Sequence, residues 1–165
     1  MSVHADGAPD GRVDAIDARV WRLVGTPLVV GAADGPLEGQ TVAVKDVFAI
    51  AGQRIGVGVR AYLAEAPVEE STAPAVRVLL DAGADVIGIA QCDQFAYSIA
   101  GLNPDYGTPP NPAVPDAIPG GSSSGPATAV ALGQATVGLG TDTAGSIRVP
   151  ASYQRLWGLR TTHGA

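Results

Sequence analysis

The spacing of apolar and polar residues predicts an amphipathic helix near the start of the chain and a buried strand after it. Residues 11–24 carry five apolar side chains at roughly helical spacing, with charged residues between them: Val13, Ile16, Val20, Leu23 and Val24. Residues 41–45 form a short β-branched run that ends at Lys45 and is followed by Asp46. This run predicts a buried strand with a lysine at its carboxyl end.

Residues 71–90 give the clearest supersecondary pattern. Ser71 or Thr72 is a suitable N-cap, and Gly83 is a suitable end for the helix. The apolar face between them comes from Val76, Leu79 and Leu80. Residues 84–90 then read as a strand, which gives a helix–strand unit of the parallel α/β type.

The second half of the chain alternates glycine-rich turns with short regular elements. Residues 101–119 contain six prolines, which excludes regular structure and predicts a long ordered loop or a linker. We expect a helix over 124–133, a strand over 135–140 and a further strand at 156–160. The whole pattern predicts an α/β fold class.

Composition and charge narrow the range of functions. The chain is 46% hydrophobic and 16% charged, as in globular proteins. A net charge of −6 argues against partners such as nucleic acid or an anionic membrane surface. The N-terminal residues show no export signal, which favours a cytoplasmic protein. Cys92 is alone and predicted to be a buried apolar residue, and two histidines make a metal site improbable.

The stretch GGSSSG, residues 120–125, allows three interpretations. The serines can cap the following helix by accepting hydrogen bonds from its free N–H groups. A phosphate-binding loop is a weaker interpretation, because no Gly-Lys-Ser/Thr follows. The stretch also fits the Gly-x-Ser-x-Gly nucleophile elbow, with Ser123 as nucleophile and Asp142 and His163 following in hydrolase order.

The second glycine-rich turn, GLGTDTAGSIRVP at residues 138–150, points to acyl chemistry. Small residues let a substrate carbonyl approach the backbone, where consecutive N–H groups can form an oxyanion hole. The N–H groups in question belong to Thr143, Ala144 and Gly145. Ser146 would then be a nucleophile that needs a base. Lys45 is either a surface residue with an extended side chain or, if buried, a base with a lowered pKa.

Several motifs in order carry a family resemblance. They are VAVKD, STAPAV…LLDAGADVIG, CDQFAYSIAG, YGTPPNP, PGGSSSG and GLGTDTAGSIRVPAS. Together they resemble the amidase signature family from about residue 36 to the end of the chain. The combination AYS…YGTP-xNP with the ending R-xx-HG is most similar to bacterial amidases that resemble plant indole-3-acetamide amidase.

The resemblance implies a fold, a reaction and a set of site residues. The implied fold is a mixed sheet with helices on both faces, truncated after the nucleophile region. Residues 1–35 would be an N-terminal helical segment, and residues 36–165 the N-terminal part of the amidase signature domain. Lys45 would be the base, Ser122 a bridging residue after a cis peptide bond, and Ser146 the nucleophile. Asp142 and Arg148 would brace the loop.

The implied reaction is hydrolysis of a small-molecule carboxylic amide through a seryl acyl-enzyme, with no metal or organic cofactor. Four positions depart from the usual pattern: Gln94, Pro126, Ala144 and Arg155. Ala144 replaces a glycine and would be strained in a left-handed backbone, and Arg155 also stands where glycine is usual. Family members are several times longer than this chain, which predicts an exposed sheet edge and association with another copy or another chain. An inactive binding or structural module is the alternative.

Overall fold

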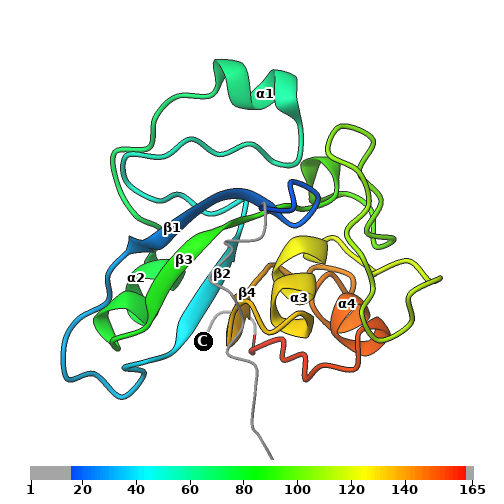
Figure 1. The fold of residues 1–165 in the computed structure, drawn as a ribbon. Coiled ribbons are helices and arrows are strands. Elements are labelled where there is room, and N and C mark those ends of the chain that lie inside the picture. The colour runs from blue at the N-terminus through cyan, green and yellow to red at the C-terminus, as the bar shows by residue number, and fades with distance from the viewer. Residues whose placement is uncertain (1–15, 163–165) are drawn as a thin grey trace, which may run out of the picture.

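The computed structural model describes residues 16–162 and consists of one four-stranded sheet with helices packed against it (Figure 1). The sheet order is β1-β3-β2-β4. β1 is antiparallel to β3, whereas β2 is parallel to both β3 and β4. The elements are β1 (Trp21–Val29), β2 (Thr41–Lys45), α1 (Arg60–Glu65), α2 (Pro74–Asp81), β3 (Asp85–Ala90), the 3₁₀-helix η1 (Gln94–Ala96), α3 (Ser124–Ala131), β4 (Val137–Leu139) and α4 (Arg148–Tyr153).

Helices cover both faces of the sheet, as expected. Successive residues of a strand point to opposite faces, and the core divides accordingly. Val42 and Val44 of β2 pack in one cluster with Val76 of α2. Ala43 packs in a second cluster with Ala129 of α3. The α/β fold class with a mixed sheet is therefore confirmed.

The first segment of the chain differs from its predicted helix. Residues 11–15 lie outside the described part, and Trp21–Val29 form β1 at the edge of the sheet. Val24 pairs with Gly88 of β3, in a ladder with register shifts. Pairing with β3 satisfies the backbone of this segment and overrides its local helical spacing. The described part of the N-terminal segment, residues 16–35, therefore contributes a strand to the sheet and contains no helix.

Three smaller expectations also changed. The N-cap of α2 is Ala73, and Thr72 instead accepts a hydrogen bond from the Ala51 N–H through its Oγ1. Residues 156–160 form no strand. Ser123 is the N-cap of α3 but makes no side-chain capping bond. The helices expected over 71–83 and 124–133 and the strands expected over 41–45, 84–90 and 135–140 are confirmed with small changes of boundary.

The proline-rich segment 101–119 is an ordered loop, fastened by two buried asparagines. Asn103 donates from Nδ2 to the carbonyls of Gly58 and Cys92. Asn111 donates from Nδ2 to the carbonyls of Ile118 and Tyr153, the last residue of α4. This loop therefore connects the end of β3 to the start of α3 along a fixed path.

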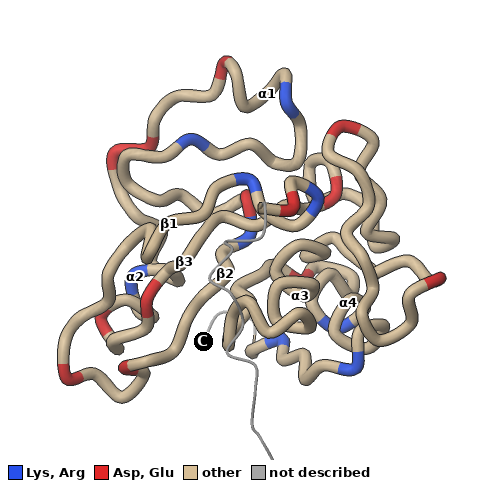
Figure 2. The backbone as a smooth tube through the Cα atoms, in the orientation of Figure 1, with Lys and Arg blue, Asp and Glu red and all other residues tan. Residues whose placement is uncertain are grey.

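Charged residues of both signs are interspersed along the chain (Figure 2). Within residues 16–162, no helix is long and apolar enough to cross a bilayer.

β4 pairs only with β2 among the described residues, so its other edge is unpaired in that part of the chain.

Candidate active site

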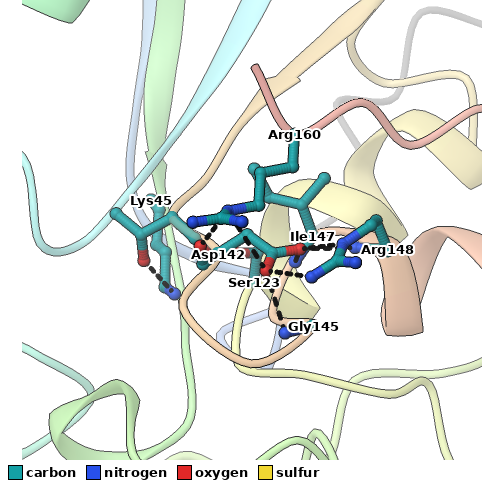
Figure 3. Close-up of polar contacts among 8 residues, drawn as sticks. Lys45, Ser123, Asp142, Gly145, Ile147, Arg148 and Arg160 are labelled. Atoms are coloured by element: carbon teal, nitrogen blue, oxygen red, sulfur yellow. Dashed lines mark hydrogen bonds and ion pairs between the residues drawn. The ribbon is translucent and has the colours of Figure 1, made fainter. Parts of the chain in front are cut away.

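Lys45 is the last residue of β2, and its side chain has no exposed surface. β2 lies between β3 and β4, and Lys45 pairs with Ala90 of β3, one residue beyond the last pair between β2 and β4. Figure 3 shows the side chain directed toward the loop that carries Asp142. Lys45 is also the only lysine in the chain. The structure thus selects the buried alternative for this residue.

Two hydroxyl groups hold the lysine amine. Nζ of Lys45 lies 2.7 Å from Oγ of Ser122 and 2.8 Å from Oγ1 of Thr141. The peptide bond between Gly121 and Ser122 is cis, as the resemblance implied. Thr141 was not among the predicted site residues, although it belongs to the same glycine-rich motif as Asp142. Its position next to the end of β4 brings its hydroxyl to the lysine.

The surroundings of Lys45 favour a neutral amine. Burial lowers the pKa of Lys45 from 10.5 to about 8, because the charged form loses its hydration, while the neighbouring Cys92, Asp93 and Asp142 oppose this effect. A lysine with a pKa of about 8 is still mostly protonated at pH 7 and is half deprotonated at pH 8. Its lone pair can then accept a proton from the hydroxyl of Ser122.

Ser146 approaches the same segment through the backbone. The N–H of Ser123 donates to the carbonyl of Ser146 at 3.1 Å, which places Ser146 beside the residue that follows Ser122. Ser146 is 7% exposed. Among the described residues, none forms a hydrogen bond with the Ser146 hydroxyl, so the structure joins Lys45 to Ser122 and leaves Ser146 next to them.

Asp142 organises the turn that carries Ser146 (Figure 3). Its side chain is 1% exposed, and its carboxylate forms a bidentate ion pair with the guanidinium of Arg148, with both N···O distances 2.9 Å. It also accepts hydrogen bonds from the N–H groups of Gly145, Ile147 and Arg148. The pairing with Arg148 holds the pKa of Asp142 well below its usual range. Asp142 therefore fixes the backbone on both sides of Ser146.

These bonds change the expected oxyanion hole. The Gly145 N–H donates to Oδ1 of Asp142 at 2.8 Å, so it is already used in this structure. The N–H groups of Thr143, Ala144 and Ser146 have no acceptor among the described residues. Ala144 does not have a positive φ, so the strain expected there is absent, whereas Gly145 has φ +129° and Arg155 has φ +57°.

The nucleophile-elbow arrangement receives no support from this geometry. The elbow requires a strand directly before the nucleophile, but a loop precedes Ser123. The Ser123 hydroxyl donates to the carbonyl of Thr141, and the Asp142 carboxylate is occupied by Arg148. His163 lies outside the described residues.

A cavity of about 810 Å³ lies apart from the lysine. Residues of α3, β4, α4 and the segment 155–162 line it, and of the candidate residues only Ser123 and Asp142 reach it. Within residues 16–162, no cluster of three or more histidine, cysteine or acidic side chains could hold a metal ion.

The fold and site together describe an α/β protein whose mixed sheet presents a buried lysine–serine pair. A family model described as Amidase matches residues 26–165, and the chain belongs to the amidase family.

The relatives agree with this assignment. The chain is 47% identical over 148 residues to Amidase 1 of Arabidopsis thaliana, covering 90% of this chain and 35% of that protein. A crystal structure of an amidase superposes with a TM-score of 0.63 at 43% identity, over 71% of this chain and 26% of that one. The glutamyl-tRNA(Gln) amidotransferase structure from Thermotoga maritima superposes with a TM-score of 0.72 at 33% identity, over 83% and 30%. The chain thus spans about a quarter to a third of the length of these relatives.

Proposed function

We propose that this chain carries the catalytic residues of an amidase, which hydrolyses a carboxylic amide to an acid and ammonia or an amine. The observation that carries the proposal is the contact between the buried Nζ of Lys45 and Oγ of Ser122, at 2.7 Å. A buried lysine with a lowered pKa next to a hydroxyl can act as a general base without a histidine. The similarity to Amidase 1 supports the same class of reaction.

In the proposed mechanism a proton passes along a chain of three residues. Neutral Lys45 accepts the proton of Ser122, and Ser122 accepts the proton of Ser146 as Oγ of Ser146 attacks the amide carbonyl. The carbonyl oxygen becomes an oxyanion, for which the free N–H groups of Thr143, Ala144 and Ser146 are suitable donors.

The tetrahedral intermediate then collapses. Ser122 gives a proton to the amide nitrogen, the C–N bond breaks, and ammonia or an amine leaves. A water molecule, deprotonated by the same Ser122–Lys45 pair, attacks the seryl ester; the ester C–O bond breaks, the proton returns to Oγ of Ser146, and the acid is released. These steps require no metal or organic cofactor. Formation of the attacking geometry requires the hydroxyls of Ser146 and Ser122 to meet.

The experiment that tests the proposal is mass spectrometry of the purified chain after treatment with a fluorophosphonate probe. We expect labelling at Ser146 that is lost in Lys45→Met and retained in His163→Ala. Labelling at Ser123 that depends on His163 would instead support the elbow. A folded wild-type chain that is not labelled would contradict the proposal and favour the binding-module alternative.

Self-association through the unpaired edge of β4 remains a prediction. Light scattering coupled to size exclusion checks it, because a chain that stays monomeric at all concentrations would contradict it.

A further inference from the structure

Asp93 is a buried acid that the proposed mechanism does not use. It follows β3 after Gln91 and Cys92, and it has no exposed surface. Its Oδ2 accepts a hydrogen bond from the N–H of Gly101 at 3.0 Å, and the hydroxyls of Ser98 and Ser124 lie close enough to the carboxylate to lower its pKa, whereas Oδ1 is buried with no hydrogen bond of good geometry. An unpaired buried carboxylate oxygen is costly. Its position therefore needs an explanation.

The carboxylate of Asp93 packs directly against the segment that carries Ser122. A Cβ atom added at Gly121 would lie 2.4 Å from Oδ1 and 2.5 Å from Oδ2, so only glycine fits there. The backbone N–H of Asp93 also donates to the carbonyl of Ser122 at 3.2 Å. Asp93 thus contacts both residues of the Gly121–Ser122 pair, and Ser122 in turn binds Lys45.

We propose that Asp93 is a positioning residue whose carboxylate fixes the Gly121–Ser122 segment and places a negative charge behind the serine that binds Lys45. The catalytic importance of Asp93 rests on the function proposed above. Its effect on the position of Ser122 and on the protonation of Lys45 is a property of the folded chain alone. A carboxylate near a buried lysine stabilises the protonated amine. Asp93 therefore counteracts burial and keeps the lysine titrating within the range where it can both accept and return a proton.

The other ionisable groups near Lys45 are less suited to this role. Burial raises the pKa of the Cys92 thiol to about 12, so the thiol is neutral at the pH where the lysine titrates. The carboxylate of Asp142 is already neutralised by its bidentate pair with Arg148.

The acid next to Lys45 in sequence is also paired. Asp46 forms an ion pair of 2.9 Å with Arg22. Asp93 makes no such ion pair among the described residues, although burial raises its pKa. Its charge is therefore the one best placed to act on the lysine.

The test is a direct titration of Lys45 by NMR. Because the chain has a single lysine, incorporation of ¹³C-lysine gives one side-chain Cε signal, and its shift from pH 5 to 11 reports the protonation of Lys45 without resonance assignment. In Asp93→Asn we expect the midpoint to fall by about one pH unit relative to wild type. The matched control is Asp105→Asn, an acid in the proline-rich loop that binds Arg60 and should leave the midpoint unchanged.

A folded Asp93→Asn variant with the wild-type midpoint would overturn the proposal, because a purely structural role would not move this titration. If the variant does not fold, wild type provides the second measurement. With the titration extended to lower pH, its Lys45 signal should show a smaller inflection where Asp93 titrates, at a pKa that burial raises above the ordinary value of an aspartate, and a folded chain without that inflection also overturns the proposal. Neither measurement needs turnover. An inactive chain with a shifted midpoint would therefore contradict the proposed function and support the role of Asp93.

Discussion

Replacing Lys45 by methionine should change how the stability of the protein depends on pH. Methionine keeps an unbranched apolar chain of similar length and removes the titrating amine. In the folded protein, burial lowers the pKa of Lys45 from 10.5 to about 8, and each pKa unit corresponds to about 1.4 kcal/mol. The buried charge therefore costs the wild-type protein about 3 kcal/mol of unfolding free energy below pH 8.

The sign follows from proton uptake. Between about pH 8 and 10.5 the unfolded chain binds more protons at this lysine than the folded chain does, so the stability of wild type rises with pH in this window. Lys45→Met has no such contribution. We therefore expect wild type to gain about 3 kcal/mol relative to the variant as the pH rises from 7 to 10.5.

Urea denaturation followed by circular dichroism at several pH values measures this difference. Lost hydrogen bonds to Ser122 and Thr141 change the offset between the two proteins but not its dependence on pH. Groups that titrate in both proteins cancel in the comparison. A difference that stays constant within about 0.5 kcal/mol across this range would show that the lysine is not desolvated and would contradict its role as a base.

Three further predictions concern individual side chains. Asp142→Ala leaves three backbone N–H groups and Arg148 without their acceptor, so urea denaturation should show an unfolding free energy lower by about 2–4 kcal/mol. Arg148→Gln changes a side chain that is 53% exposed, so it should lower the unfolding free energy by less than about 1 kcal/mol. Arg155→Gly removes a side chain from a left-handed backbone with φ +57°, so it should raise the unfolding free energy by about 1 kcal/mol. Thermal unfolding should show this as a higher midpoint temperature. Cys92 is buried, with its thiol pKa raised to about 12, so it should react with a disulfide reagent only after unfolding; rapid reaction of the native chain would contradict its burial.

The sequence predicted those parts of the fold whose local pattern agrees with their environment. The strand ending at Lys45 reads as apolar because α2 packs on one face of it and α3 on the other, and α2 shows its buried face through Val76. The helix predicted over residues 11–24 was wrong at residues 21–24 because their apolar spacing fits a helix, whereas the partners of β1 lie about 65 residues further along, in β3. Only the complete sheet determines that choice.

The site was predictable in its composition but not in all its contacts. The motif resemblance indicated Lys45 and Ser122, and the structure brings their polar atoms within hydrogen-bond distance. The hydrogen bond from the Gly145 N–H to the Asp142 carboxylate depends on the geometry of the turn, which residue spacing does not reveal. The approach of Asp93 to Gly121 likewise depends on where two distant loops meet.

The hydrogen bonds of Lys45 join positions that are 77 and 96 residues apart in the chain. We expect such contacts to form late in folding, because long loops must close before they are made. During synthesis, a chain that has not yet reached Thr141 can make only one of these two bonds. In an unfolded or incomplete chain the lysine is hydrated and has its ordinary pKa near 10.5, so it is protonated and is no base. The lowered pKa of Lys45 is therefore a property of the fully synthesised and folded chain. A reagent that reacts only with a neutral lysine would distinguish native protein from misfolded and nascent chains.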